Sequence, residues 1–305
     1  MIIFMKPKID ILMATYNGEK YIEEQLKSII SQSCENWNLV IRDDGSDDNT
    51  LRILNEYSKR DKRIHIISDN KGNLGLVKNF EELMKHSTEE YIMFSDQDDA
   101  WADNKINILL QKMQETEEKM QIKKSILVHS NSYICDKELN IKKNRFISKK
   151  ANEVKIENIF FNFIVQGSAI MINKELKNLS LPFFNEVYLH DRYLHLLVEL
   201  FGKRVFIDKP LNYYRQHEKN LIGSSKINIM NEIFHRRFYH KNDRLLIKKI
   251  YDLFSKEIEL KTKEAIEAYL KITSVETGRF KKLKLLRKNK IYLPIKKKVF
   301  LVLKG

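Results

Sequence analysis

Short apolar segments alternate with amphipathic ones through the first hundred residues of this chain. The apolar segments have the composition of buried strands and lie at residues 8–14, 38–42, 64–67 and 91–95. The segments between them place apolar residues at helical spacing. Strict alternation of strands and helices predicts parallel strands joined by right-handed crossovers. We therefore expect an α/β fold with a Rossmann-like, mostly parallel sheet flanked by helices.

The last of these strands stops on three carboxylates, Asp96, Asp98 and Asp99. Carboxylates this close together repel one another unless a cation lies among them. Mg²⁺ or Mn²⁺ takes one or two carboxylates and completes its coordination with water and substrate phosphates. The motif therefore favours a metal-dependent site for a substrate that carries a diphosphate. The alternative is a solvated acidic loop or a helix N-terminus, where Asp is favourable whatever the function.

Polar clusters also follow the first two strands, at residues 15–18 and 43–50. In a parallel sheet the carboxyl ends of the strands share one edge, and ligands bind there. The loop at residues 69–75, which is interrupted by glycines, is expected beside this edge. Several polar clusters at one edge make a nucleotide pocket the better explanation.

Individual residues of these clusters suit particular contacts. Asp43 or Asp44 could accept hydrogen bonds from a base or a ribose. Thr15 and Tyr16 could pack against the base. Helix capping is the alternative explanation for the polar residues at 43–50.

Four motifs occur in a recognisable order, and they are Ala14-Thr15-Tyr16-Asn17-Gly18, Asp43-Asp44-Gly45-Ser46-Asp47-Asp48-Asn49-Thr50, Asn70-Lys71-Gly72-Asn73-Leu74-Gly75 and Ser95-Asp96-Gln97-Asp98-Asp99-Ala100-Trp101. This order resembles glycosyltransferase family 2, the nucleotide-sugar transferases of GT-A fold, over about the first 220 residues. Asp-Gln-Asp-Asp followed by Ala-Trp is most similar to the bacterial rhamnosyltransferase-like branch.

The resemblance implies roles for the acidic residues. In that family the first acidic pair contacts the nucleoside, and the Asp-x-Asp element contacts the ribose and the metal-bound diphosphate. Those roles would fall to Asp43 or Asp44, to Asp96 and to Asp98. The predicted nucleotide- and donor-binding pocket comprises Thr15, Tyr16, Asn17, Asp43, Asp44, Asn70, Lys71, Gly72, Asp96, Gln97 and Arg215, together with Gln166 and Gly167 of a loop on its acceptor side.

Two later segments carry the predicted acceptor side of the site. Gly167, next to Gln166, allows close approach of the backbone to a ligand where the family has an acceptor-side loop, although a plain tight turn would also explain it. Asp191 matches the position of the family's general base, which stands at the head of a helix and is usually written Glu-Asp. His190 replaces the Glu, and we expect a half-exposed histidine there. Local sequence alone would treat Asp191 as a helix-start acid.

Further strands are predicted at residues 126–130 and 204–207, and Arg215 and His217 follow the second of them. The family often has such a segment closing over the donor diphosphate. Arg215 offers bidentate donors for phosphate, and neutral His217 could ligate the metal or donate to the leaving group. The alternative is that both residues pair with acids of the same edge.

The net charge of +14 belongs to the end of the chain. Residues 226–305 contain 22 Lys or Arg and 8 Asp or Glu, whereas the first 225 residues contain 33 of each. A main domain without its own basic surface argues against nucleic-acid binding. We therefore divide the chain into a catalytic domain at 1–223 and a helical, basic region at 224–305.

Cationic and apolar residues interleave after Glu276, the last acid. This pattern suits the surface of an anionic membrane. The alternative is a helix packed on the catalytic domain with a solvated basic face. No apolar run approaches membrane-spanning length, and Cys34 and Cys135 give no disulfide framework, so we expect a cytoplasmic protein, with a possible place at the inner face of the cell membrane.

These observations lead to one main functional expectation. It is an inverting, metal-dependent glycosyltransferase that moves a sugar, with rhamnose as the candidate, from a UDP- or dTDP-linked donor to a cell-surface polysaccharide or lipid-linked glycan. A sugar nucleotidyltransferase would need a Gly-rich phosphate loop with a basic residue after the first strand, and residues 14–19 lack both. A non-catalytic membrane or scaffold protein is the third possibility.

Overall fold

The computed structural model of the chain describes residues 8–148, 153, 155–218 and 229–303. The expected boundary between residues 223 and 224 therefore lies outside the described residues. The first elements along the chain are β1 (Ile9–Thr15), α1 (Ile22–Ile30), β2 (Trp37–Asp43), α2 (Thr50–Arg60), β3 (Ile64–Ile66), α3 (Gly75–His86) and β4 (Tyr91–Ser95). The four predicted strands match these strands to within one residue at each end.

The strands of this first half are parallel, as predicted. β1 lies between β2 and β4 and pairs in parallel with both, and β3 pairs in parallel with β2. Each connection runs through a helix, which is what parallel neighbours require. The strands therefore end at the same edge of the sheet, where Thr15 lies directly opposite Asp43 in the register.

The second half of the chain extends the sheet with mixed directions. Its elements are β5 (Ala100–Trp101), α4 (Lys105–Met120), β6 (Ser125–Cys135), β7 (Ile141–Lys143), α6 (Ile156–Ile159), the 3₁₀ turn η1 (Gly167–Ala169), β8 (Ile170–Asn173), α7 (Lys174–Ser180), α8 (His190–Phe201) and β9 (Gly202–Arg215). Among the described residues the strand order is β3-β2-β1-β4-β8-β6-β9-β5, with β7 paired to β6. β8 is antiparallel to both of its neighbours, whereas β6 and β9 are parallel to each other.

Two of the predicted strands were too short. The strand expected at 126–130 continues to Cys135, and the strand expected at 204–207 continues to Arg215. The continuation of β6 is polar yet buried, since Asn131 and Ser132 are almost inaccessible to solvent. A search for apolar runs stops at such residues, although their backbone pairs with the neighbouring strand.

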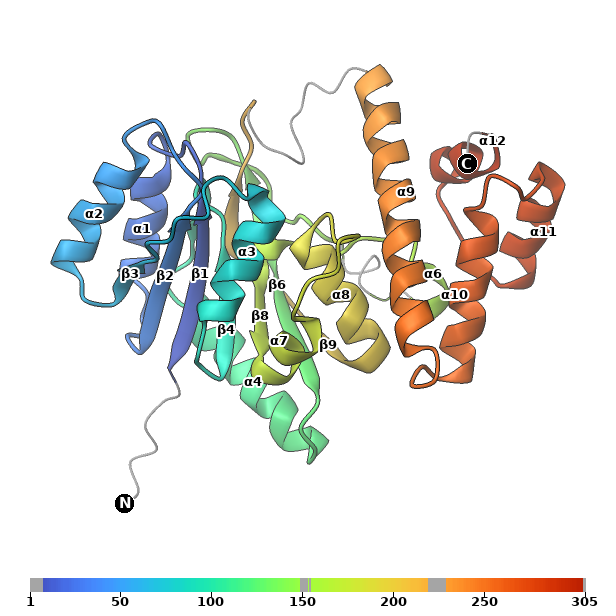
Figure 1. The fold of residues 1–305 in the computed structure, drawn as a ribbon, viewed down its shortest axis with the longest axis horizontal. Helices are drawn as coiled ribbons and strands as arrows, with labels where there is room; N and C mark the ends of the chain where they lie inside the picture. Colours follow the sequence, from blue (N-terminus) through green and yellow to red (C-terminus); the bar gives the residue numbers. More distant parts are fainter. Residues whose placement is uncertain (1–7, 149–152, 154, 219–228, 304–305) are drawn as a thin grey trace.

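The sheet is buried on both faces. In β1, the side chains of Ile9, Ile11 and Met13 join the cluster packed by α1, α2 and α4, whereas Leu12 and Ala14 join the cluster packed by α3, α7 and α8. Successive residues of a strand point to opposite faces, so a strand covered on both sides is apolar throughout. Figure 1 shows helices on both sides of the sheet.

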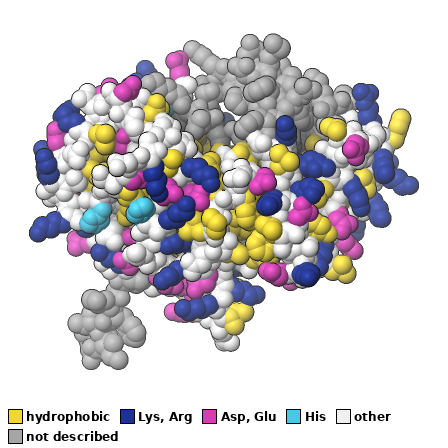
Figure 2. Space-filling model, in the orientation of Figure 1, with side chains coloured by type: hydrophobic (Ala, Val, Ile, Leu, Met, Phe, Trp, Pro, Cys, Tyr) yellow, Lys and Arg dark blue, Asp and Glu magenta, His cyan; other side chains and the backbone are white. Residues whose placement is uncertain are grey.

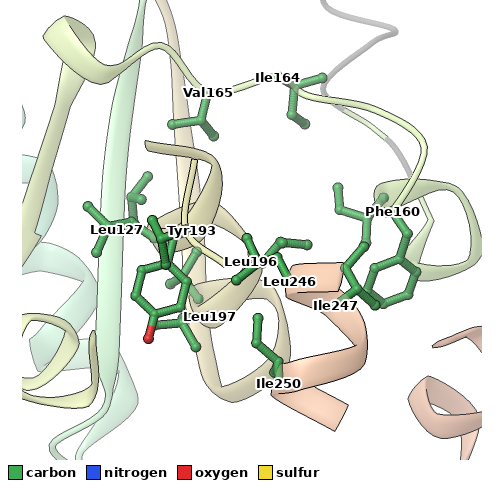
Figure 3. Close-up of a cluster of buried hydrophobic side chains, with 14 of the residues drawn as sticks. Leu127, Phe160, Ile164, Val165, Tyr193, Leu196, Leu197, Leu246, Ile247 and Ile250 are labelled. Carbon is green, nitrogen blue, oxygen red and sulfur yellow. The ribbon is translucent and has the colours of Figure 1, made fainter. Parts of the chain in front are cut away.

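The C-terminal helices are α9 (Ile229–Phe254), α10 (Leu260–Ile272), α11 (Arg279–Lys288) and α12 (Ile295–Leu303). α9 lies beside α8, and α10 to α12 lie beyond it (Figure 1). Leu246, Ile247 and Ile250 of α9 point toward Leu196 of α8 and Phe160, within the buried cluster that also covers one face of the sheet (Figure 3). The packing alternative concerned the chain after Glu276, where Leu286 and Leu301 belong to the same buried cluster. No described helix is both long and apolar enough to span a membrane.

Candidate active site

The loops after β1 and β2 are joined by the carboxylate of Asp43. Thr15 Oγ1 donates to Asp43 Oδ1 at 2.8 Å, and the backbone N–H and hydroxyl of Ser46 donate to the same carboxylate at 2.8 and 2.6 Å. Asn17 adopts a left-handed conformation with φ of 48° and accepts from the N–H of Asp47 at 2.9 Å. Asp43 is half-buried, so it both organises these loops and remains accessible at their surface.

Asp44 holds the loop at residues 70–75 in place. Its carboxylate is buried and accepts from the N–H groups of Leu74 and Gly75 at 2.8 Å and from Arg42 at 2.7 Å. Arg42 also pairs with Asp69 and holds the pKa of that carboxyl at about 2. Of the two candidate acids, Asp44 therefore has the more internal set of partners.

The loop itself presents Asn70, Lys71 and Gly72 to solvent. The carbonyl of Gly72 accepts from Arg42 at 2.9 Å, and Gly72 has a positive φ of 63°, which favours glycine. Lys71 Nζ lies 2.5 Å from Glu82 on α3.

Gln97 connects the acidic loop after β4 to the loop after β1. Its Oε1 accepts from the N–H of Tyr16 at 2.8 Å, and its Nε2 donates to the carbonyl of Tyr16 at 2.9 Å. The Gln97 amide lies so close to Gly18 that a Cβ there would be 2.3 Å from Oε1. The Tyr16 side chain is half-exposed beside this contact, where it could pack against a planar ligand.

Asp99 is buried in a polar network and does not face solvent. Its carboxylate accepts from Ser168 Oγ and Asn212 Nδ2 at 2.8 Å, and from the N–H of Arg215 at 3.0 Å. The buried Lys105 ammonium donates to the carbonyl of Ser168 at 2.5 Å and lies over the Trp101 ring. These contacts hold the acidic loop against η1 and β9, although burial still raises the pKa of Asp99 to about 6.

Asp98 of the same loop lies beside His217. Asp98 Oδ2 is 2.8 Å from His217 Nε2, and the His217 ring stacks on Tyr21 with centroids 4.8 Å apart. Arg215 is buried below them and donates to the carbonyl of Asp98 at 2.6 Å, while its Nη2 lies 2.5 Å from Glu24. His217 thus pairs with an acid of this edge, as the pairing alternative has it, whereas Arg215 pairs with Glu24 of α1.

Asp98 and His217 fit a divalent cation such as Mg²⁺, which takes few protein ligands and fills its other coordination positions with water and phosphate oxygens. Burial and the charges of Asp99 and Asp98 raise the pKa of Asp96, and a cation would relieve that repulsion. Asp98 and His217 supply an oxygen and a nitrogen 2.8 Å apart. Within the described ranges, no group of three or more His, Cys, Asp or Glu side chains is placed to enclose a metal. A site with one or two protein ligands is therefore the form that fits.

Asp191 lies at the first turn of α8 and faces Gly167. Its Oδ2 accepts from the N–H of Gly167 at 3.1 Å, and its Oδ1 accepts from the N–H of Arg192 at 2.7 Å. Burial raises the pKa of Asp191 to about 7, against the lowering effect of these hydrogen bonds. A carboxylate with this pKa is suited to accept a proton at neutral pH. Next to Gly167, Gln166 accepts from Ser132 Oγ at 2.6 Å.

The expectation of a half-exposed His190 was wrong. The ring is buried between Phe80 and Phe94, with centroids 4.0 and 5.4 Å away, and burial lowers its pKa to about 3. His190 Nε2 would lie 2.8 Å from a Cβ at position 167. The histidine therefore supports the backbone beside Asp191 as a neutral, apolar-packed ring.

Tyr214 is a site residue that the sequence reasoning missed. Burial, and after it the charges of Asp99, Asp96, Asp98 and Asp191, raise the pKa of its hydroxyl, so acids from both predicted halves of the site lie within electrostatic range of Tyr214. Tyr213, its neighbour, stacks on Tyr133 instead. Successive residues of a strand point to opposite faces of the sheet, so a strand predicted through both tyrosines would have put only one of them on the side of the acids. Nothing in the local sequence of Lys105 or Asn212 marks them as site residues, because their part in the hydrogen-bond network around Asp99 depends on burial in the folded protein.

Known proteins resemble this chain in sequence. The family described as glycosyl transferase family 2 matches residues 10–173. The dTDP-rhamnosyl transferase RfbG of Shigella flexneri is 33% identical over 227 residues, covering 70% of this chain and 74% of the relative. The chain belongs to glycosyltransferase family 2, and it is a glycosyltransferase.

Solved structures resemble it in fold. S. aureus TarS 1-349 in complex with UDP-GlcNAc matches with a TM-score of 0.61 at 16% identity, over 97% of this chain and 81% of that chain. Mannosyltransferase PcManGT from Pyrobaculum calidifontis, in complex with GDP-Man and Mn²⁺, matches with a TM-score of 0.58 at 14% identity, over 98% and 79%. At these identities the likeness concerns the fold, and it confirms the predicted GT-A fold.

Proposed function

We propose that this glycosyltransferase transfers a sugar with inversion from a nucleoside-diphosphate donor to a glycan hydroxyl, with Asp191 as general base. The observation that carries the proposal is the setting of Asp191. The carboxylate is held by two backbone N–H groups, and burial raises its pKa to about 7. Its charge is among the causes that raise the pKa values of Asp96 and Tyr214. The proposed base therefore lies within electrostatic range of the acidic loop that is proposed to bind the metal and the donor diphosphate.

The chemical step requires little more than these residues. The acceptor oxygen forms a bond to the anomeric carbon while the bond from that carbon to the diphosphate oxygen breaks. The acceptor proton passes to the Asp191 carboxylate, because an alcohol becomes a strong nucleophile only as it loses that proton. Attack from the face opposite the diphosphate inverts the anomeric centre.

The donor end is proposed to lie along the loops after β1, β2 and β4. Asp43 is the better of the two candidates for the nucleoside, because Asp44 is engaged by Arg42 and by two N–H groups. Asp98 and His217 would hold Mg²⁺ or Mn²⁺, with Asp96 beside them. When bound, the metal would neutralise the departing diphosphate. The dTDP-linked rhamnose donor is suggested by the name of the RfbG relative.

The acceptor is proposed to be a growing surface polysaccharide on a lipid carrier, at the inner face of the cell membrane. The surface of α11 supports this. Phe280, Lys284 and Arg287 share one exposed face of that helix, whereas Lys282 and Leu286 are buried on the other. Phe280 is 90% exposed, and Tyr292 and Ile295 beyond the helix are 80% and 81% exposed.

The charged side chains of the chain after Glu276 are all cationic. The exposed cations among the described residues after Glu276 are Arg279, Lys281, Lys284, Arg287, Lys288, Lys290 and Lys298. Figure 2 shows Lys and Arg side chains gathered along the right-hand edge, where Figure 1 draws α11. Exposed apolar side chains surrounded by cations fit an anionic lipid surface.

One experiment tests the proposed reaction directly. The purified chain is incubated with dTDP-rhamnose or a UDP-sugar, with Mg²⁺ or Mn²⁺, and with a lipid-linked glycan extracted from membranes. Release of nucleoside diphosphate together with a heavier glycan supports the proposal. In a parallel incubation, formation of a nucleoside-diphosphate sugar and pyrophosphate from a sugar 1-phosphate and a nucleoside triphosphate would instead indicate a nucleotidyltransferase.

A further inference from the structure

Arg192 stands next to the proposed base and is buried, with 1% of its surface exposed. A buried guanidinium needs partners for its donors, and all of those found here belong to other elements. Nε donates to Asp243 Oδ1 at 2.8 Å, Nη1 to the carbonyl of Asn162 at 3.0 Å, and Nη2 to the carbonyl of Phe160 at 2.9 Å. Arg192 of α8 is therefore hydrogen-bonded both to α9 and to the segment that follows α6.

The two carbonyl acceptors belong to the segment that leads to Gly167. That segment runs from α6 through residues 160–166, and its end supplies the N–H that donates to Asp191 Oδ2. The backbone N–H of Arg192 donates to Asp191 Oδ1. Arg192 thus contributes to both hydrogen bonds of the carboxylate: to one through its own N–H, and to the other by holding the segment that carries Gly167.

Asp243 brings the C-terminal region into this arrangement. It lies on α9, and its Oδ1 also accepts from the hydroxyl of Tyr188 at 2.8 Å, just before α8 begins. Three residues further along α9, Leu246 enters the core shared with α8 (Figure 3). The ion pair is shielded by this core, since the side chain of Asp243 is only 15% exposed. A shielded, hydrogen-bonded Arg–Asp pair holds its geometry more firmly than an exposed one.

We propose that Asp243 of α9, acting through Arg192, is a positioning residue for Asp191, so that the C-terminal region is required for the chemical step of transfer. This inference rests on the proposed function, because it takes Asp191 as the base. The C-terminal region then has two connected roles: its α11 surface meets the membrane, and its α9 holds the base in place. Neither Asp243 nor Arg192 is assigned any contact with the donor or the acceptor.

The test compares two substitutions on the same helix. Asp243→Asn keeps the size of the side chain and removes its charge, and the pair to Arg192 is broken. Asp252→Asn removes a matched carboxylate from the exposed pair with Lys248, where Asp252 is 52% exposed. For each variant, kcat, the donor KM and the nucleotide-induced thermal shift are measured, at a temperature below unfolding.

We expect Asp243→Asn to lower kcat by about tenfold or more, the scale of a misplaced catalytic group, with an unchanged donor KM and thermal shift. Asp252→Asn should behave as the parent, and Asp243→Glu should recover part of kcat. A kcat of Asp243→Asn within twofold of the parent would overturn the inference. An equal loss of donor affinity would also overturn it, because that is the result of general loosening.

A second variant covers the case in which Asp243→Asn does not fold. Tyr188→Phe removes the hydrogen bond that holds Asp243 Oδ1 where Arg192 Nε also donates, so it should loosen the pair and lower kcat alone by a smaller factor. An unchanged kcat there would reject the inference. Failure of the proposed function is distinguishable, since it would appear as an Asp191→Asn variant that transfers sugar as fast as the parent.

Discussion

Gly167 and His190 approach each other so closely that a Cβ at position 167 would lie 2.8 Å from His190 Nε2. The same Cβ would lie 3.4 Å from Asp191 Oδ2. Because His190 is packed between Phe80 and Phe94, the ring has little freedom to move aside. The absence of a side chain at Gly167 is what lets its N–H reach the Asp191 carboxylate.

We predict that Gly167→Ala lowers the transfer rate by about tenfold or more, because a small displacement of a catalytic carboxylate is costly. Nucleotide binding should persist, since the donor loops are formed by other elements. Gly278→Ala is the matched control, because nothing lies within 4 Å of the added Cβ and the residue has an ordinary φ of −60°. Steady-state kinetics of the two variants check this. A Gly167→Ala variant as active as Gly278→Ala would contradict the close-approach argument.

The pH dependence of transfer should report Asp191. Burial raises its pKa to about 7, and the base must be ionised to accept a proton. The rate should therefore be full above this pKa and fall as the pH decreases through about 7. Asp191→Asn should lower transfer by about a hundredfold or more and remove this acid limb, while nucleotide binding remains. A variant within a few-fold of the parent would exclude Asp191 as the base.

Asp98→Asn should abolish the metal-dependent part of nucleotide binding. The variant keeps the size of the side chain and removes the charge that a divalent cation needs. Thermal shifts with dTDP, UDP and GDP, each with and without Mn²⁺ or Mg²⁺, measure the effect. Asp103→Asn, an exposed acid a few residues away, serves as control. Full metal-dependent stabilisation of Asp98→Asn would show that another residue holds the metal.

Lys284→Ala combined with Arg287→Ala should weaken attachment to anionic vesicles. Each basic residue near such a surface contributes about 1 kcal/mol, so the pair corresponds to about thirtyfold in the binding constant. Lys119→Ala with Lys123→Ala removes the same charge from exposed positions on the catalytic half. Co-sedimentation at low salt compares the two. Equal attachment of both double variants would favour a solvated basic face on α11.

A chain ended near Gly223 is a poorer test of membrane attachment than these point variants. Leu246, Ile247 and Ile250 of α9 lie in the core shared with α8, so their removal would expose Leu196 and Phe160. Loss of attachment in such a chain could then reflect loss of the fold.

The alternation of strands and helices, and the edge to which the acidic loops are delivered, were predictable from sequence. Both depend on local periodicity: Ile9 to Thr15 are buried and mostly apolar because the strand is covered on both sides. The order of the motifs was likewise enough to predict the family. The pairing of His217 with Asp98 was one of the alternatives that the sequence left open, and the place of Asp191 at the head of a helix was predicted.

Only the tertiary structure decided what these residues contact. His190 is neutral and buried because Phe80 and Phe94, distant in sequence, close around it. Lys105, an ordinary lysine at the start of a helix, is buried beside Ser168 and Asn212 by the packing of α4 against the sheet. Burial and partner choice depend on contacts between residues far apart in the chain, and these govern desolvation and hydrogen bonding. Residue types and local spacing therefore determined the strands, helices and site loops, whereas pKa values, pairings and the link from Asp191 to α9 were set by the folded packing.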